Sequence, residues 1–239
     1  AFVIAKEVAQ EKFCKFKDKL EAMEISLRVG LAYLTNGIVS SPLEGFTNLK
    51  LKKRKDGEEY FCLYFSGPIR SAGTTAVCAF VALSDYIRHE MGYNTYDPTD
   101  VEIKRIVIEL TDFHEKVTNL QYMPSEEELA FMTEKLPLQI DGDPSEKYDV
   151  SNYKYLDRIE TNRLRNGVCL VFGEGLTQKA KKFWGIFSKW YKDFNMGHWD
   201  FIKDFLELQT RIRAREKKQE VKKSEEKIKP DYVYISDIV

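Results

Sequence analysis

The stretch from Tyr60 to Gly92, YFCLYFSGPIRSAGTTAVCAFVALSDYIRHEMG, decides the fold. It begins with an aromatic and apolar run of strand character, which Ser66-Gly67-Pro68 stops. From Thr74 onward, apolar residues recur at helical spacing up to Gly92, and glycine is typical just after a helix end. The stretch therefore predicts a strand, a short loop and a buried helix in succession.

The loop between this strand and this helix, Gly67 to Thr75, is rich in small residues and carries the guanidinium of Arg70. Free backbone N–H groups and the positive end of the helix dipole favour an anion at a helix start. Ser71 and Gly73 would allow a phosphate to approach closely. The spacing matches neither the P-loop nor the dinucleotide loop. The alternative is a tight turn that packs a strand against a helix.

The composition predicts a globular chain of one or two domains, because 43% of its 239 residues are hydrophobic. The sequence has no apolar run of about 18 residues and no signal-peptide pattern at its start. We therefore expect a soluble, cytoplasmic protein that does not contact a membrane. The cysteines lack zinc-site spacing, so we expect reduced thiols and no metal site; they are Cys14, Cys62, Cys78 and Cys169.

Charge is unevenly distributed, although the formal net charge is only -1. Residues 97–146 hold thirteen acids and four bases, a charge of -9, whereas residues 211–229 hold nine bases and four acids, a charge of +5. A basic arm can bind nucleic acid, but a mixed run of this kind is also typical of a solvated helix face or linker.

The N-terminal part predicts one long amphipathic helix over residues 2–36, because apolar residues alternate steps of three and four. It begins without Met or a capping signal, and we expect a chain cut from a longer protein. Asp56-Gly57, between two alternating runs, predicts a hairpin. Five bases from Lys50 to Lys55 could face phosphate or block edge-to-edge sheet pairing.

Two further helices follow the central one. Asp97-Pro98-Thr99 predicts the N-terminus of the first helix, and Ser125 with Glu128 predicts a capping box at the N-terminus of the second. A short strand over residues 138–140 then meets Asp141-Gly142-Asp143-Pro144. We interpret its two aspartates as turn formers rather than metal ligands, because no further acids follow at calcium-loop spacing.

A second informative stretch runs from Ile159 to Lys182. It predicts a polar loop, a buried strand over residues 168–172, a Gly-x-Gly turn and a basic helix. Its side chains offer donors for phosphate or carboxylate, namely Asn162, Arg163, Arg165, Lys179, Lys181 and Lys182. The alternative is that Glu160 or Glu174 pairs with these arginines and fixes the turn. The Trp-rich section that follows predicts core.

The fold class expected is α+β, mostly helical, with short strand pairs and hairpins. We expect an N-terminal helix over residues 1–36, an α+β accessory domain over residues 37–197 and a basic helix or linker over residues 198–229. Residues 230–239 would then begin a further domain in extended conformation.

Six stretches resemble the large subunit of the archaeal family D DNA polymerase, also called DNA polymerase II. They are LTNGIVSSPLEG, YFSGPIRSAGTTA, NLQYMPSEEEL, LPLQIDGDPSE, IETNRLRNGVCLVFGEGLTQKAKK and PDYVYISDIV, in the family's order. The chain departs from the family pattern at Thr74, where SAGGTA has Gly, and at Asn166, where RGG has Gly. Either change could weaken a role that needs close backbone approach.

The resemblance implies the polymerising subunit of a two-subunit replicative enzyme that works with the chromosome. Such an enzyme extends primer-template DNA with Mg2+, and its 3'-to-5' exonuclease is associated chiefly with the small subunit. The family's Asn-Ala-Asp-x-Asp motif is absent from this sequence, so the resemblance places catalysis and Mg2+ outside this chain. The implied partners are the small subunit, DNA, and the sliding clamp through regions outside this chain.

Three hypotheses for this chain follow from the sequence. In the first, the loops around Arg70, Arg163 and Arg165 contact the DNA backbone or support the catalytic core. In the second, the chain is a protein-interaction module that binds the small subunit without touching DNA. In the third, the Gly67 to Thr75 loop makes an independent nucleotide-binding enzyme, which the missing Lys-Ser/Thr signature and general base disfavour.

Overall fold

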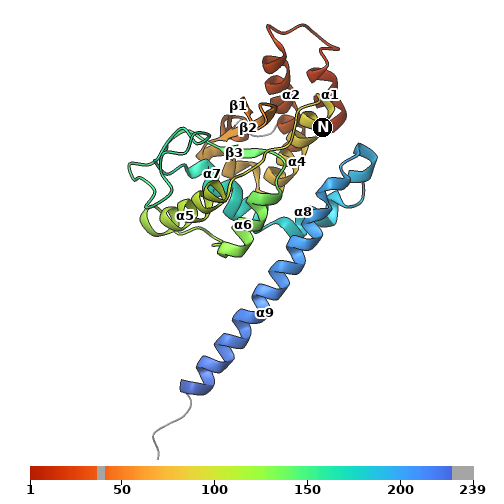
Figure 1. Cartoon of the computed structure of the whole chain (residues 1–239). Coiled ribbons are helices and arrows are strands. Elements are labelled where there is room, and N and C mark those ends of the chain that lie inside the picture. Colours follow the sequence, from red (N-terminus) through yellow and green to blue (C-terminus); the bar gives the residue numbers. More distant parts are fainter. Residues whose placement is uncertain (37–40, 228–239) are drawn as a thin grey trace, which may run out of the picture.

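The computed structural model describes residues 1–36 and 41–227, with side chains over residues 1–36 and 43–219. A three-stranded sheet of order β1-β2-β3 lies among the helices (Figure 1). Its strands are β1 (Phe46–Lys53), β2 (Glu59–Phe65) and β3 (Gln139–Asp141). β1 pairs with β2 antiparallel, and β3 pairs with β2 in parallel. The expected α+β class, mostly helical, is confirmed.

The predicted hairpin is confirmed at the turn between β1 and β2. Arg54 N–H donates to the carbonyl of Glu58 at 2.8 Å, and Gly57 has a φ of 90°. That left-handed conformation favours glycine, which explains the Asp-Gly pair. All β2 residues after Glu59 are buried, so this strand forms the middle of the sheet on both faces.

The predicted central helix is α4 (Thr74–Glu90), and it is buried along most of its length. Gly92 follows it with a φ of 79°, as expected for a residue just beyond a helix end. Helix α4 contacts the N-terminal helices, β2 and the segments that precede α9. It therefore organises the packing of the whole body (Figure 1).

The prediction of one long N-terminal helix is wrong. The chain forms α1 (Phe2–Ala9) and α2 (Lys19–Leu34), which pack against each other. A turn separates them because Glu11 takes a φ of 55° and Asp18 caps α2, accepting from Glu21 N–H at 2.9 Å. The predicted stop at Gly37 lies outside the described residues. The short helix α3 (Ser41–Gly45) precedes β1.

The two predicted helices after α4 are confirmed as α5 (Asp100–Lys116) and α6 (Glu126–Lys135). Thr99 and Glu102 form a capping box at α5, and Ser125 and Glu128 form the predicted one at α6. Each box satisfies two backbone N–H groups that a helix start leaves without intrahelical partners.

The prediction of a strand over residues 168–172 is also wrong. The chain there is helical, as α7 (Asn166–Leu170) followed directly by the π-helix η2 (Val171–Thr177). The glycines Gly173 and Gly175 lie inside η2, packed near Leu120 and Val77, and make no turn. A short, wholly apolar run fits a buried helix as well as a buried strand.

The C-terminal part of the body is aromatic core, as predicted. Helix α8 (Ala180–Phe187) and the 3-10 turns η3 (Tyr191–Phe194) and η4 (Gly197–Asp200) surround the fully buried Trp199. Trp199 Nε1 donates to the buried carboxylate of Asp85 in α4 at 2.7 Å. This bond fastens η4, and the helix that follows it, to the centre of the body.

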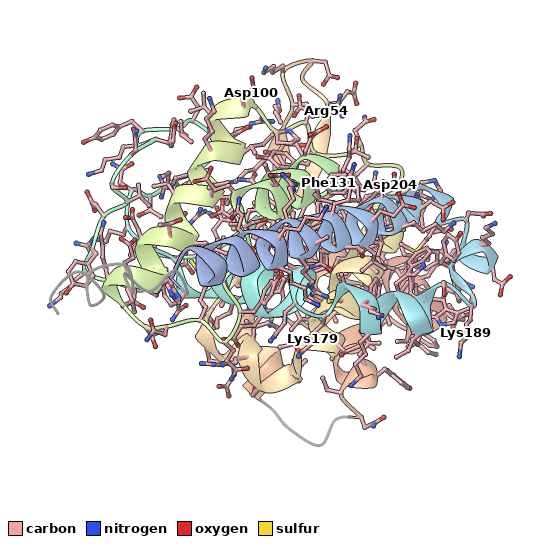
Figure 2. The ribbon with its side chains drawn as sticks, turned by 90° about the horizontal axis from the view of Figure 1, so that it is seen from below. Arg54, Asp100, Phe131, Lys179, Lys189 and Asp204 are labelled. Atoms are coloured by element: carbon pink, nitrogen blue, oxygen red, sulfur yellow. The ribbon has the colours of Figure 1, made fainter. Side chains whose placement is uncertain are left out.

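The last helix, α9 (Phe201–Lys227), packs beside α6 and α8 and then leaves the body (Figure 1). Figure 2 shows Phe131 of α6 and Lys179 on opposite sides of it. Among the α9 side chains that the structure describes, Ile212 is the last buried one, and residues 213–219 are all exposed. Arg215 pairs with Glu127 at 2.8 Å, so the basic segment, residues 211–229, contacts the acidic segment, residues 97–146, at this pair.

Over the described residues, the helices lack the apolar length that a membrane crossing needs. The segment expected to be extended, residues 230–239, lies outside them.

Candidate nucleic-acid interface

The predicted Gly67 to Thr75 loop forms a short 3-10 helix, η1 (Gly67–Ala72), between β2 and α4. The buried side chain of Ile69 anchors η1. The backbone of Ile69 lies so close to Gly45 that a Cβ on that glycine would be 2.2 Å from Ile69 N. Arg70 and Ser71 are exposed, and Gly73 turns the chain into α4 with a φ of 77°. The loop therefore presents its one guanidinium to solvent at the start of α4.

A buried carboxylate from η2 positions the guanidinium of Arg70. Arg70 Nη2 lies 2.9 Å from Oε1 of Glu174, which also accepts from Gln121 N–H at 3.3 Å. The Glu174 side chain is only 2% exposed, whereas that of Arg70 is 47% exposed. The remaining guanidinium N–H groups can therefore donate to a phosphate while Glu174 holds the side chain in place.

Lys179 of the second stretch lies near the first turns of α4. α4 begins without a side-chain cap or an acid in its first turn. Burial raises the pKa of the Cys78 thiol in α4 to about 12, and the nearby charge of Lys179 opposes that rise. Lys181 and Lys182 are exposed in the first turn of α8. Among the side chains described, none of these three lysines has a carboxylate within 4.0 Å.

Asn162 and Arg163 belong to a separate, hairpin-like loop. Val150 N–H donates to Asn162 O, and Leu164 N–H donates to Tyr148 O, both at 2.9 Å. The Asn162 side chain accepts from Tyr155 N–H at 2.8 Å, whereas the Arg163 side chain is exposed. Asn162 thus has a structural role in this loop, and Arg163 is available to a ligand.

The prediction that Arg165 contacts nucleic acid is wrong, because Arg165 is not available to DNA. Its side chain is fully buried, and Nε donates to Oε1 of Glu109 at 2.9 Å. Its Nη1 pairs with Oδ1 of Asp141 at 2.5 Å. A buried guanidinium needs such compensation, and these two carboxylates supply it. Neither Glu160 nor Glu174 is its partner.

The interpretation of Asp141 as a turn former is also wrong. It is the last residue of β3, is 1% exposed, and accepts from Lys52 Nζ at 2.9 Å in addition to Arg165. Burial alone would raise its pKa, but the charges of Arg165 and Lys52 outweigh that effect and hold the pKa below the ordinary value. Asp143 is exposed. Lys50 pairs with Glu160 at 2.7 Å and Arg54 with Asp56 at 3.2 Å, so with Lys52 three bases of the hairpin form ion pairs.

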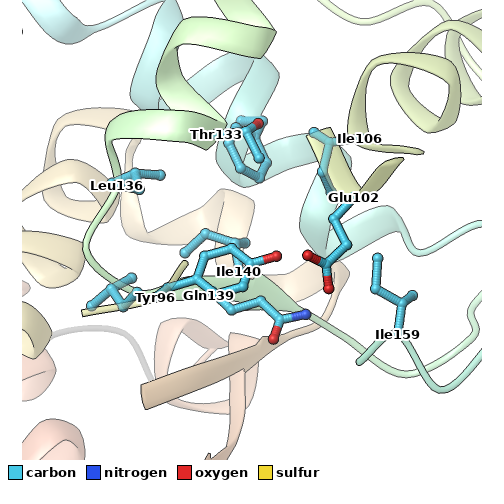
Figure 3. Close-up of a pocket in the computed structure, with 10 residues that line it drawn as sticks. Tyr96, Glu102, Ile106, Thr133, Leu136, Gln139, Ile140 and Ile159 are labelled. Atoms are coloured by element: carbon cyan, nitrogen blue, oxygen red, sulfur yellow. The ribbon is translucent and has the colours of Figure 1, made fainter. Parts of the chain in front are cut away.

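The cavity between α5, α6 and β3 is too small for a nucleotide. Its volume is about 10 Å³, which is room for about one water molecule. Glu102 of α5 and Gln139 of β3 point toward each other across it (Figure 3). Among the described residues, no group of three or more His, Cys, Asp or Glu could hold a metal ion.

Comparison with known proteins identifies the class to which this arrangement belongs. A model of the family described as DNA polymerase II large subunit DP2, N-terminal, matches residues 1–208. The DNA polymerase II large subunit of Nanoarchaeum equitans is 47% identical over 204 residues, which cover 85% of this chain and 16% of that protein. That of Methanosarcina barkeri is 40% identical over 239 residues, which cover 100% of this chain and 20% of that protein.

The relative from Thermococcus kodakarensis has the same name and is 37% identical over 228 residues, 95% of this chain and 12% of that protein. The chain thus spans a fifth or less of these relatives' lengths. It belongs to the DNA polymerase II large subunit family, of archaeal family D, and corresponds to its N-terminal portion.

The two positions at which the sequence departs from the pattern that it resembles, Thr74 and Asn166, are both partly exposed. Gly167 packs so tightly that a Cβ would lie 2.3 Å from the Phe65 carbonyl, and this chain keeps that glycine. Asn166, the position that differs, donates its N–H to Ser145 Oγ at 2.8 Å and is partly exposed. Thr74 begins α4 and is also partly exposed. Neither change falls at the closest backbone contact.

Sequence reasoning missed Glu109 and Tyr155. The helical spacing predicts Glu109 on the outer face of its helix, and this is wrong, because Glu109 is fully buried and neutralises Arg165, which is distant in the sequence. Tyr155 lies in a polar run, Ser151 to Tyr155, that reads as an ordinary loop.

Proposed function

We propose that this chain is the N-terminal part of the polymerising subunit of a two-subunit archaeal replicative DNA polymerase. The intact enzyme would carry out template-directed DNA synthesis with Mg2+ held by residues outside this chain. Its 3'-to-5' exonuclease activity would reside chiefly with the small subunit, and contact with the sliding clamp would use other regions. The membership in the large-subunit family supports this proposal.

Within that enzyme, this portion would contact the DNA backbone around the start of α4. The observation that carries this role is the half-exposed guanidinium of Arg70, held by the buried Glu174 beside a helix start without acids. Further phosphate contacts would come from Lys179, just before α8, and from Lys181 and Lys182 in its first turn. Such contacts position a duplex without reading its sequence.

The test is fluorescence anisotropy of the chain on a primed template at several salt concentrations. Arg70→Ala should weaken binding and lower the slope of log K against log salt by about 0.9 for one lost phosphate contact. Arg70→Ala also leaves the buried carboxylate of Glu174 without its cation, so we expect a lower melting temperature, and the affinities are compared well below it. Lys189→Ala, at the exposed side chain just beyond α8, is the matched control and should bind normally. Unchanged affinity in Arg70→Ala would count against the DNA role.

A second candidate function is binding of the small subunit without DNA contact. A surface groove of about 460 Å³ between α5 and α6 favours it, because its lining includes Ile103, Val107, Ile108 and Ala130. Val107→Asp should then abolish co-purification of the chain with the small subunit, while Lys189→Asp should not. Failure of the unmodified chain to associate would remove this candidate.

A further inference from the structure

Tyr155 presents its ring to solvent. It is 85% exposed, whereas most tyrosines of the chain are buried or partly buried, and no other aromatic side chain among those described is as exposed. Tyr148 of the same loop is 39% exposed, with Lys147 Nζ 5.1 Å from its ring centroid. The loop of residues 147–163 therefore shows aromatic faces together with cations.

The backbone of this loop is held in an uncommon conformation. Tyr153 and Tyr155 have φ values of 54° and 60°, in the left-handed region that bulky residues rarely adopt. The surrounding structure fixes both: Tyr155 N–H donates to Asn162 Oδ1 at 2.8 Å, and the buried Arg105 donates to Tyr153 O at 3.1 Å and to Thr161 O at 2.9 Å. Backbone strain of this kind clusters at ligand-binding sites.

The surroundings of the Tyr155 ring are polar. It borders a concavity of about 250 Å³ whose lining includes Asp157, Glu160, Thr161 and Asn162. The carboxylate of Asp157 there can accept from the exocyclic amine of a nucleobase. Arg163 follows Asn162, and its backbone forms an antiparallel β-bridge with that of Asp149. The side chain of Arg163 is exposed, and no described carboxylate lies within 4.0 Å of it.

We propose that Tyr155 stacks on an unpaired base of single-stranded DNA, with Arg163 on an adjacent phosphate. This inference rests on the proposed role in DNA binding. Stacking on an exposed aromatic ring tolerates any base, whereas bases inside a duplex do not present their faces. A protein partner is disfavoured because anchor aromatics at protein interfaces sit among well-packed, desolvated contacts, whereas the neighbours of Tyr155 include the exposed acids Asp157 and Glu160.

The first experiment measures the fluorescence anisotropy of a fluorescein-labelled dC 20-mer, and of a duplex of equal length, with the chain. Tyr155→Ala should weaken single-strand binding roughly 5- to 150-fold, with the salt slope unchanged, because stacking releases no counterions. Tyr155→Phe should bind within about twofold of the unmodified chain, since it keeps the ring. Duplex binding should be unaffected by either. Tyr33→Ala, at an exposed tyrosine of α2, is the matched control.

Two further measurements complete the test. Arg163→Gln should lower the single-strand salt slope by about 0.7. A 20-mer containing 5-iododeoxyuridine should crosslink to Tyr155 on irradiation, as mapped by mass spectrometry. Equal melting temperatures of all variants verify that they fold.

The outcomes separate this inference from the proposed function. If Tyr155→Ala binds the 20-mer normally while Arg70→Ala weakens duplex binding, the stacking site is refuted and the backbone contact stands. If the unmodified chain binds neither DNA, both are refuted. If Tyr155→Ala loses only association with the small subunit, the surface serves a protein and the stacking site is refuted.

Discussion

Arg165 and Glu109 form an ion pair in which both side chains are 0% exposed. Glu109 Oε1 accepts from both the backbone N–H and the Nε of Arg165, each at 2.9 Å. Glu109 Oε2 accepts from Arg165 Nη2, so three hydrogen bonds join α5 to the start of α7. Arg105 pairs with the same carboxylate at 3.1 Å. One carboxylate therefore serves two buried guanidinium groups.

Glu109→Gln should lower the free energy of unfolding by about 3–5 kcal/mol, because it leaves buried guanidinium charge without compensation. Urea denaturation followed by circular dichroism measures the effect. Glu115→Gln on the same helix is the control, since Glu115 is exposed and should change stability by no more than about 0.5 kcal/mol. A similar small effect for both variants would contradict the importance of this ion pair.

Asp141 should make stability depend on acid pH. Its folded-state pKa is held below the ordinary value of about 3.9, so its contribution is complete above that pH and is lost as pH falls through the folded pKa. Melting temperatures from pH 6 to pH 2 should therefore decline below about pH 4.

The variant that tests this is Asp141→Asn, which should melt at a lower temperature at pH 6 and show a shallower acid decline. Asp143→Asn, two residues away and exposed, should follow the unmodified chain at every pH. Parallel acid profiles for all three proteins would show that Asp141 is not the responsible group.

Two glycines should respond to alanine in opposite directions. Gly57→Ala should destabilise the hairpin by about 1 kcal/mol, because alanine is strained at a φ of 90°. Gly185→Ala should stabilise α8 by about 0.8–1.0 kcal/mol, since a Cβ there meets no atom within 4 Å and alanine has the higher helix propensity. Thermal denaturation checks both, and changes of equal sign would contradict the two backbone assignments.

Gly167→Ala should destabilise the chain by about 3 kcal/mol, because its Cβ would lie 2.3 Å from the Phe65 carbonyl. Asn166→Gly, which restores the family's RGG pattern, should cost no more than about 1 kcal/mol at this helix start. Chemical denaturation of both variants compares them. If the Asn166 change proved the more harmful, the close contact of Gly167 with β2 would not be the constraint that requires glycine at position 167.

Elements with local signals could be predicted from the sequence. Asp56-Gly57 specified the hairpin, Ser125 with Glu128 specified the start of α6, and Gly92 marked the end of α4. In each case the residues that determine the conformation are neighbours in the chain, so turn and capping chemistry suffices.

Features set by distant partners could not be predicted. The run from Val168 to Phe172 satisfies both strand and helix patterns, and only its packing against α4, α5 and α6 makes it helical. The burial of Arg165 depends on Glu109 and Asp141, neither of which is its neighbour in sequence. For the candidate interface, Arg70 was identified from its loop, whereas the carboxylate that holds it, Glu174, was expected to pair elsewhere.

The parallel pairing of β3 with β2 has a consequence for the order of folding. β1 and β2 can pair as soon as their hairpin is made, but Leu63 meets Ile140 only after α4, α5 and α6 lie between them in the chain. At a synthesis rate of about 5–20 residues per second, one edge of the buried strand stays open for on the order of ten seconds on the ribosome. The nascent chain therefore passes through a period in which an apolar strand edge is exposed to other chains, and β3 ends that period.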